Sequence, residues 1–168
     1  MRIGIVSDTH MFSRARALPE PLVQGLQGVD LILHAGDWVD EVVCDLFEAL
    51  APVDGIAGNN DGVDIVRRFG RRKLLELGGY RIGMVHGHGG RSTPDTAYES
   101  FRDAEGKGTA DIVLFGHSHI PYKEERGGML LFNPGSPTDK RRQPRYSYGI
   151  LQLGDRVEAD HYYFDKSN

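Results

Sequence analysis

Cysteine is almost absent from this sequence, since Cys44 is the only one among 168 residues. One thiol cannot form a disulfide within the chain, and a structural zinc site built from several thiolates is excluded as well. No apolar run approaches the roughly 20 residues that a membrane-spanning helix needs. The N-terminal residues lack the apolar core and the small-residue cleavage site of a secretory signal peptide. We therefore expect a cytoplasmic protein with no membrane-spanning segment.

An excess of positive charge is missing too. Lys and Arg number 20 and Asp and Glu number 24, which gives a formal net charge of −4. The chain as a whole therefore has no strong attraction to nucleic acid or to an anionic membrane. Two short segments, residues 67–73 and 140–145, are basic. A solvated surface explains most such runs, and steering of an anionic substrate is the alternative.

Length and composition are typical of a globular protein. Hydrophobic residues make up 39% of the chain and charged residues 26%, so neither a disordered nor a fibrous protein is indicated. We expect residues 1–168 to form a single domain. The 22 glycines are roughly twice the average usage of about 7%, which indicates many tight turns.

Short apolar runs alternate with longer amphipathic stretches through the first two thirds of the chain, as in βαβ units. The pattern predicts strands at residues 3–7, 31–34, 53–56, 73–77, 81–86 and 112–115, and helices at 20–26, 41–50 and 95–105. Beyond Gly116, β-hairpins are expected around Gly127 and Gly128 and around Gly154 and Asp155. We expect these late strands to form a second, mostly antiparallel sheet that packs face to face on the first.

Residues that bind metals well follow most of the predicted parallel strands. These residues are Asp8, His10, Asp37, Asn59, His86, His88, His117 and His119. Because the carboxyl ends of parallel strands meet at one edge of a sheet, side chains at these ends converge. Each motif alone is more often structural, but five of the seven histidines fall at these positions. The ordered set predicts a metal site at this edge.

The mixture of donors indicates which metals the site accepts. Carboxylate, imidazole and amide oxygen suit Mn²⁺, Fe²⁺, Co²⁺, Ni²⁺ and Zn²⁺. Two such ions about 3.5–4 Å apart stabilise both the attacking and the leaving oxygen of a phosphoryl displacement. Histidine must be neutral to coordinate, so metal occupancy is expected to fall below about pH 6.5, the unperturbed imidazole pKa.

Six motifs in this order resemble the calcineurin-like metallophosphoesterase superfamily. They are "SDTH", "HAGD", "GNND", "HGH", "GHSH" and "NPGS", and they extend from residue 7 to residue 136. The resemblance is closest to the small single-domain bacterial and archaeal phosphodiesterases, which are relatives of the retromer subunit of the same fold. It implies an α/β fold, a four-layer α/β/β/α sandwich of two mixed sheets flanked by helices, and a binuclear metal centre.

The resemblance also implies a role for each motif residue. Asp8, His10 and His119 would bind the first metal, Asp37 would bridge the two metals, and Asn59, His86 and His117 would complete the second. Asp61 would act as an acceptor that fixes a neighbouring group. The alternative for His117 and His119 is a pair of turn histidines that hydrogen-bond to the backbone.

Asn60 departs from the pattern of the wider superfamily, in which many members carry histidine at this position to protonate the leaving oxygen. An amide side chain cannot act as that acid. We therefore expect substrates with good leaving groups to react best, with His88 or a metal-bound water assisting. Asp37, Asn60, Asp61 and His88 are the catalytic candidates, although His88 has the alternative of an orienting or exposed residue.

Several other residues near the motifs have two explanations each. His34 is either a core histidine or a ligand, and Trp38 either packs in the core or stacks on a substrate ring. Ser136 of the "NPGS" turn is a candidate ligand contact. The guanidinium groups of Arg91, Arg141 and Arg145 either contact phosphate or are solvated.

The predicted function is metal-dependent hydrolysis of a phosphodiester by a hydroxide that bridges two divalent ions, with Mn²⁺ as the first choice. The substrate is expected to be a small phosphoester or a nucleotide-like molecule. A phosphomonoesterase or nucleotidase is the nearest alternative, and a non-catalytic interaction scaffold of the same fold is an alternative of a different class. The sequence leaves open the physiological substrate, the native metal and whether the chain forms homo-oligomers.

Overall fold

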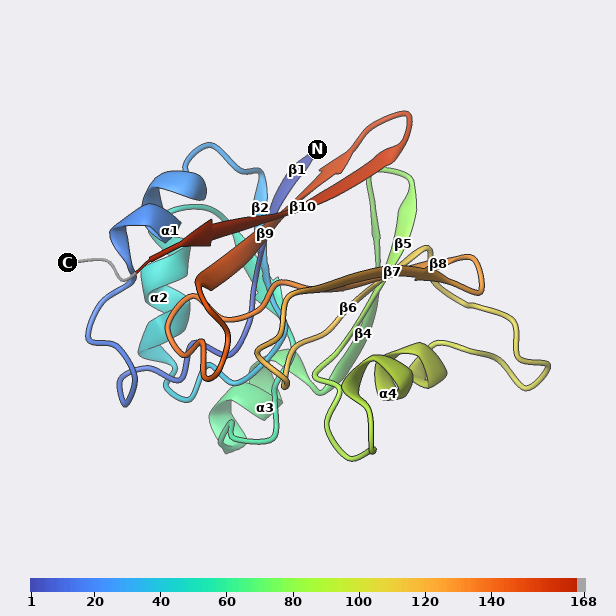
Figure 1. Ribbon diagram of the computed structural model, residues 1–168, viewed down its shortest axis with the longest axis horizontal. Coiled ribbons are helices and arrows are strands. Elements are labelled where there is room, and N and C mark those ends of the chain that lie inside the picture. Colours follow the sequence, from blue (N-terminus) through green and yellow to red (C-terminus); the bar gives the residue numbers. More distant parts are fainter. Residues whose placement is uncertain (166–168) are drawn as a thin grey trace.

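The computed structural model describes residues 1–165; residues 166–168, the end of the expected domain, lie outside the described part. Two five-stranded sheets lie face to face (Figure 1). The first, in the order β10-β9-β1-β2-β3, contains β1 Arg2–Val6, β2 Leu31–His34, β3 Val53–Gly55, β9 Tyr146–Leu153 and β10 Val157–Phe164. The second, in the order β4-β5-β6-β8-β7, contains β4 Arg72–Leu77, β5 Tyr80–Val85, β6 Ile112–Leu114, β7 Tyr122–Arg126 and β8 Met129–Asn133.

Both sheets are mixed. In the first, β1, β2 and β3 are parallel, whereas β9 runs antiparallel to β1 and to β10. In the second, β5, β6 and β8 are parallel, and β4 and β7 are antiparallel edge strands. Each sheet therefore has a parallel centre, whose carboxyl ends form a common rim.

The two late hairpins form as predicted, but their assignment to one antiparallel sheet is wrong. Hairpin β7–β8 joins the second sheet through β6, and hairpin β9–β10 joins the first sheet through β1. In β9 the residues alternate between the two sides of the sheet: Leu151 packs between the sheets, and Ile150 packs under the helices. Both faces of β9 are buried in this way only when it lies beside β1.

Three apolar clusters fill the spaces between four layers, which confirms the expected α/β/β/α sandwich. The outer cluster on one side joins Val6 and Ile32 of the first sheet to Leu22 and Phe47 of the helices. The central cluster, which includes Ile3, lies between the sheets. The third cluster joins the second sheet to the helix on its outer face. Alternation along β1 explains this division, because successive side chains point to opposite faces.

Helices cover both outer faces (Figure 1). They are α1 Glu20–Gly25, α2 Val42–Glu48, α3 Val63–Phe69 and α4 Thr93–Ser100. Helix α3 was not predicted, although Ile65 and Phe69 are four residues apart and both are buried, and Gly70 follows with a φ of 71°. The basic residues among 67–73 favoured a solvated surface segment over a helix in the sequence analysis.

Helix α4 ends at Ser100, five residues before the predicted end at 105. The carboxylate of Asp103 accepts hydrogen bonds from the backbone N–H groups of Glu105 and Lys107. This side chain therefore offers the backbone an alternative to the helical hydrogen bonds. Among residues 1–165, no helix is long and apolar enough to cross a membrane.

Candidate metal centre

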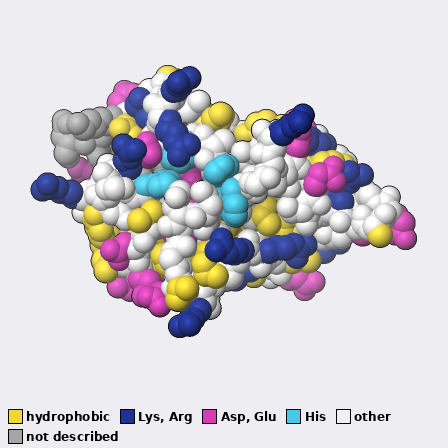
Figure 2. All heavy atoms as spheres, turned by 90° about the horizontal axis from the view of Figure 1, so that it is seen from below, with side chains coloured by type: hydrophobic (Ala, Val, Ile, Leu, Met, Phe, Trp, Pro, Cys, Tyr) yellow, Lys and Arg dark blue, Asp and Glu magenta, His cyan; other side chains and the backbone are white. Residues whose placement is uncertain are grey.

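The predicted ligands follow the strands whose carboxyl ends form the rim. Asp8 and His10 follow β1, Asp37 follows β2, and the turn 58–61 follows β3; His86 and His88 follow β5, and His117 and His119 follow β6. Figure 2 shows histidine side chains gathered near the middle of one face, with an acidic side chain between them and Lys and Arg side chains on several sides. Two layers of the sandwich thus contribute to one site.

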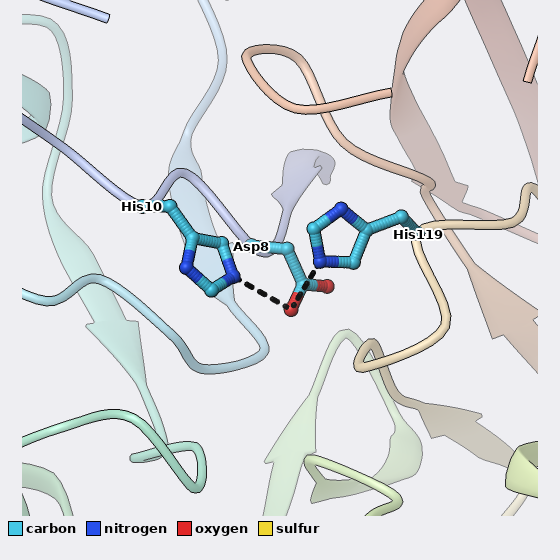
Figure 3. A group of neighbouring side chains, drawn as sticks. All are labelled: Asp8, His10 and His119. Atoms are coloured by element: carbon cyan, nitrogen blue, oxygen red, sulfur yellow. Dashed lines mark ion pairs between the residues drawn. The ribbon is translucent and has the colours of Figure 1, made fainter. Parts of the chain in front are cut away.

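Asp8, His10 and His119 form the first group of candidate ligands, and their ligand atoms lie within 4.8 Å of one another. Both imidazoles point toward the carboxylate of Asp8 (Figure 3). His119 Nε2 lies 3.5 Å from Asp8 Oδ1, and His10 Nε2 lies 3.8 Å from the same oxygen. The space between these three atoms is enclosed by groups that bind cations.

Asp8, Asp37 and His86 form a second group by the same criterion. His86 Nε2 lies 3.6 Å from Asp8 Oδ1 and 3.2 Å from Asp37 Oδ2. His10 Nε2 is also 3.3 Å from Asp37 Oδ2. Both carboxylates therefore lie between the imidazoles of His10 and His86, and Asp8 belongs to both groups of candidate ligands.

Four buried atoms at this centre have no hydrogen-bond partner within residues 1–165. They are Asp8 Oδ1, His10 Nε2, His86 Nε2 and His119 Nε2. Buried polar atoms are nearly always hydrogen-bonded, and four orphaned atoms in one place require a cause. A divalent cation satisfies all of them, because it accepts lone pairs from carboxylate and imidazole alike. The donor set therefore fits a metal centre.

Backbone carbonyl groups orient the two most buried imidazoles. His86 Nδ1 donates to the carbonyl of Ala35 over 2.7 Å, and His119 Nδ1 donates to the carbonyl of Asp139 over 2.5 Å. With the proton on Nδ1, the neutral ring presents a lone pair on Nε2. Both rings therefore turn a metal-binding nitrogen toward the carboxylates.

Backbone strain is concentrated at the same positions. Among residues 1–165, seven residues other than glycine have a positive φ, namely Asp8, His10, Asp37, Val39, His117, His119 and Arg141. Five of these seven are predicted ligands. Such conformations cost free energy and persist where the surrounding structure requires them, as at functional sites.

Asp61 and Asn60 hold the loop that carries Asp37. The buried carboxylate of Asp61 accepts hydrogen bonds from the backbone N–H groups of Asp37, Val39 and Gly58, over 2.8, 2.7 and 2.7 Å. Asn60 donates to Asp37 through its backbone N–H and its side-chain amide, each over 2.9 Å. The "GNND" turn thus fixes the position and the hydrogen bonding of Asp37.

The remaining predicted residues lie around this centre. His117 is half-buried, its ring centroid is 5.2 Å from that of His86, and its backbone N–H donates to Asp8 Oδ2. His88 is also half-buried, and its ring centroid lies 5.7 Å from that of His86. Asn59 is exposed on the turn before Asn60. Of the two neighbouring amides, the Asn60 side chain is the one hydrogen-bonded to Asp37.

Opposite charges across the centre shift the pKa values of its groups. Burial opposes ionisation of Asp37, but the adjacent imidazoles of His10 and His86 outweigh burial and lower its pKa far below the usual range. Burial likewise opposes protonation of His10, but Asp37 and Asp8 raise its pKa to about 9. In contrast, burial lowers the pKa of His34 to about 3. The centre therefore favours positive charge between its carboxylates.

We predict that metal binding releases protons at neutral pH. In chelator-treated protein His10 is protonated until the pH approaches its pKa of about 9, so a metal must displace that proton. Affinity for Mn²⁺ should therefore rise about tenfold per pH unit for each proton displaced. Calorimetric titration in buffers of different ionisation enthalpy measures both the number of protons released and the affinity for Mn²⁺.

The raised pKa of His10 also affects the stability of the metal-free fold. A raised pKa stabilises the chelator-treated fold below pH 6.5, and this contribution is lost as the pH rises through about 9. The unperturbed value of about 6.5, expected from the sequence, is too low for His10. Equal Mn²⁺ affinity at about pH 6.5 and about pH 8.5 would contradict the predicted proton release.

Comparison with known families decides where this chain belongs. Residues 1–156 match the model of the calcineurin-like phosphoesterase superfamily domain. The chain belongs to the calcineurin-like phosphoesterase superfamily. This finding confirms the resemblance carried by the motifs, and it agrees with the arrangement of the two sheets.

Individual relatives of this superfamily member come from archaea and other organisms. A "Probable metallophosphoesterase" of Methanothermobacter thermautotrophicus is 37% identical over 165 residues, covering 95% of this chain and 91% of the relative. "Phosphodiesterase MJ0936" of Methanocaldococcus jannaschii is 30% identical over 148 residues, 80% of this chain and 83% of the relative. The crystal structure of Vps29 complexed with zinc, from Entamoeba histolytica, has a TM-score of 0.73 at 22% identity, covering 98% of this chain and 100% of that one, and shows a shared fold.

The structure shows what His34, Trp38 and Ser136 contact, which the sequence left open. His34 is buried and stacks on Trp38 at 3.8 Å between ring centroids, and its Nδ1 accepts from the N–H of Gly36. Trp38 is fully buried and donates to the carbonyl of Ile56. Ser136 donates to the backbone carbonyl of Asp8 and supports the ligand loop.

Other supporting groups were missed by sequence reasoning. Thr138 donates to the carbonyl of Thr9, and Asn133 donates to the carbonyl of Gly116 and to Ser118. The "NPGS" motif was a usable signal for Asn133. The carbonyl groups of Ala35 and Asp139 gave no signal, because every residue type has a backbone carbonyl.

Proposed function

We propose that this protein is a phosphodiesterase that uses two divalent metal ions, with Mn²⁺ as the first choice and Fe²⁺, Zn²⁺, Ni²⁺ or Co²⁺ as alternatives. The single observation that carries the proposal is the group of four buried, unpartnered ligand atoms around Asp8 and Asp37. Membership of a phosphoesterase superfamily supplies the reaction class, and one relative is named a phosphodiesterase.

In this proposal Asp8, His10 and His119 would hold the first metal, Asn59, His86 and His117 would complete the second, and the two would share Asp37. When bound, the ions would lower the pKa of a water molecule and offset the charge of the phosphoryl oxygens. His86 and His119 keep their Nε2 lone pairs directed at the centre because their Nδ1 protons are held by backbone carbonyls. Asp61 fixes the backbone on both sides of Asp37.

The function is tested with bis(p-nitrophenyl) phosphate and p-nitrophenyl phosphate in Mn²⁺ and after chelation. A phosphodiesterase hydrolyses the diester with the higher kcat/KM, and chelation abolishes the activity, which added Mn²⁺ restores. A higher kcat/KM for the monoester would replace this proposal with a phosphomonoesterase or nucleotidase.

A non-catalytic scaffold remains a candidate of a different class, because the chain shares its fold with Vps29. Membership of the superfamily and the phosphodiesterase named among the relatives favour the enzyme, whereas metal binding alone does not separate the two, because Vps29 also forms a complex with zinc. Activity after Mn²⁺ reconstitution distinguishes the two. A Mn²⁺-loaded protein that hydrolyses neither test ester would favour the scaffold.

Leaving-group dependence is a second prediction of the proposed mechanism. Asn60 donates to Asp37 Oδ2 through its amide, and an amide cannot deliver a proton to a poor leaving group. Rates should therefore fall steeply along a series of diesters from p-nitrophenyl to alkyl leaving groups, and Asn60→His should flatten this dependence. The measurement is the slope of log kcat/KM against the pKa of the leaving alcohol.

His88 is the residue of this chain proposed to assist departure of the leaving group or to contact the phosphate. It is half-buried beside His86 and His117. His88→Ala should lower kcat/KM on every member of the series. Rapid hydrolysis of alkyl diesters by the wild type, together with full activity of His88→Ala, would contradict this account.

A further inference from the structure

A cavity of about 530 Å³ opens beside the candidate metal centre. Residues 88–92 line one part of it, and the exposed side of α4 lines the rest. His88 connects this cavity to the centre, since its ring centroid lies 5.7 Å from that of His86 and 6.1 Å from that of His117. A substrate whose phosphate lies at the metals can therefore extend one arm into the cavity.

The loop part of the cavity carries hydrogen-bond donors without protein partners. The guanidinium group of Arg91 forms no ion pair within residues 1–165. In the same described part, the backbone N–H groups of residues 88–91 donate to no backbone carbonyl. The buried Nδ1 of His88 also has no partner there. Consecutive free N–H groups next to an arginine are a typical anion-binding arrangement.

The helix part of the cavity carries two carboxylates, and both are already paired. Asp95 Oδ1 lies 2.7 Å from Arg126 Nη1, and Glu99 Oε1 lies 2.8 Å from Arg102 Nη1. The charge of Arg91 has no such compensation in the described structure, and the positive charge of Arg71 also acts on His88. The loop part is therefore electropositive relative to the rest of the cavity.

The lining contains no apolar side chain, because it consists of His88, two glycines, Arg91 and the polar residues of α4. The arginine fork and the free N–H groups match a phosphate group, which offers three acceptor oxygens.

We propose that residues 89–92 bind a second phosphate group on the arm of the substrate that is not released. The substrate class is then a phosphodiester that carries an additional phosphate on its retained alcohol, such as a nucleotide with phosphates on both sides of the sugar. This inference rests on the proposed phosphodiesterase function, and it assigns Arg91 as a residue that determines substrate specificity.

Two substrates that differ by one group test the inference. Thymidine 5′-(p-nitrophenyl phosphate) and its 3′-phosphorylated form share the leaving group and the nucleoside. In the presence of Mn²⁺, the 3′-phosphorylated form should have a kcat/KM at least about tenfold higher, and the ratio should fall as the salt concentration rises. Equal values of kcat/KM for the two substrates would overturn the inference.

The variants are compared by the ratio of kcat/KM for the 3′-phosphorylated substrate to kcat/KM for the unphosphorylated one. A general loss of activity affects both values and leaves this ratio unchanged. Arg91→Gln should reduce the ratio to within about twofold of one, and Arg91→Lys should retain part of it because the charge is kept. The matched control is Arg156→Gln, since Arg156 is exposed in the turn between β9 and β10 and pairs with Glu158. An Arg91→Gln variant with the wild-type ratio would overturn the inference.

Failure of the inference and failure of the proposed function give different results. If the unphosphorylated substrate is hydrolysed in Mn²⁺ but the 3′-phosphate gives no advantage, only the second phosphate site is wrong. If neither substrate nor bis(p-nitrophenyl) phosphate is hydrolysed, the phosphodiesterase itself is wrong, and the inference fails with it.

Discussion

Asp37→Asn is expected to lower kcat/KM for bis(p-nitrophenyl) phosphate by about three orders of magnitude, because the metals contribute several kcal/mol of charge stabilisation to the reaction. The carboxylate lies 3.3 Å from His10 Nε2 and 3.2 Å from His86 Nε2, so it faces both groups of candidate ligands. Asparagine keeps the shape of the side chain and removes its charge. Steady-state kinetics with saturating Mn²⁺ measures the loss.

Metal content gives an independent measurement on the same variant. Asp37→Asn should bind less than the wild-type amount of Mn²⁺, as determined by elemental analysis after dialysis. Asp160→Asn is the matched control. Asp160 is exposed on β10, so this substitution makes the same chemical change away from the rim. Wild-type metal content together with an activity loss below about tenfold in Asp37→Asn would contradict the proposed role, since a tenfold loss is only about 1.4 kcal/mol.

Asp61→Ala is expected to lower the free energy of unfolding by about 3–5 kcal/mol, because several buried hydrogen bonds to one charged group are lost together. The carboxylate of Asp61 is 8% exposed and accepts from three backbone N–H groups on two loops. Alanine leaves these donors without a partner. Denaturant unfolding of chelator-treated protein measures the change without the contribution of bound metal.

Asp103→Ala is the matched control for this prediction. Asp103 also accepts two backbone N–H groups, but its loop is exposed and water replaces the lost acceptor. We therefore expect a change below about 1 kcal/mol for Asp103→Ala. A similarly small change in Asp61→Ala would show that Asp61 does not hold the two loops. Activity of Asp61→Ala should also fall, because the backbone of Asp37 loses its support.

Much of the candidate site could be predicted because its metal-binding residue types stand close together in short motifs of the sequence. Asp8 and His10 stand two residues apart after a buried strand, and His117 and His119 repeat this arrangement after β6. Parallel strands bring such ends to one rim, so five of the seven predicted ligands lie close together although they are far apart along the chain. The structure brings Asp8, His10 and His119 together, as well as Asp37 and His86.

Other parts of the site depend on groups that the sequence does not distinguish. The carbonyls that orient His86 and His119 belong to Ala35 and Asp139, residues with no marked chemistry of their own. The cavity at residues 88–92 exists because α4 turns back beside the loop. Neither feature has a local pattern, since each depends on the distance between separate segments.

The sequence by itself determined the class of fold, the alternation of strands and helices, and the set of candidate metal-binding side chains, because each of these follows from local periodicity or from the chemistry of single residues. The tertiary structure alone decided that β9 and β10 extend the first sheet and that β7 and β8 extend the second. It also decided that Asp8 faces both groups of imidazoles. Strand partners and shared ligands are set by which apolar faces can be buried together, and that requirement acts across the whole chain rather than within any one segment.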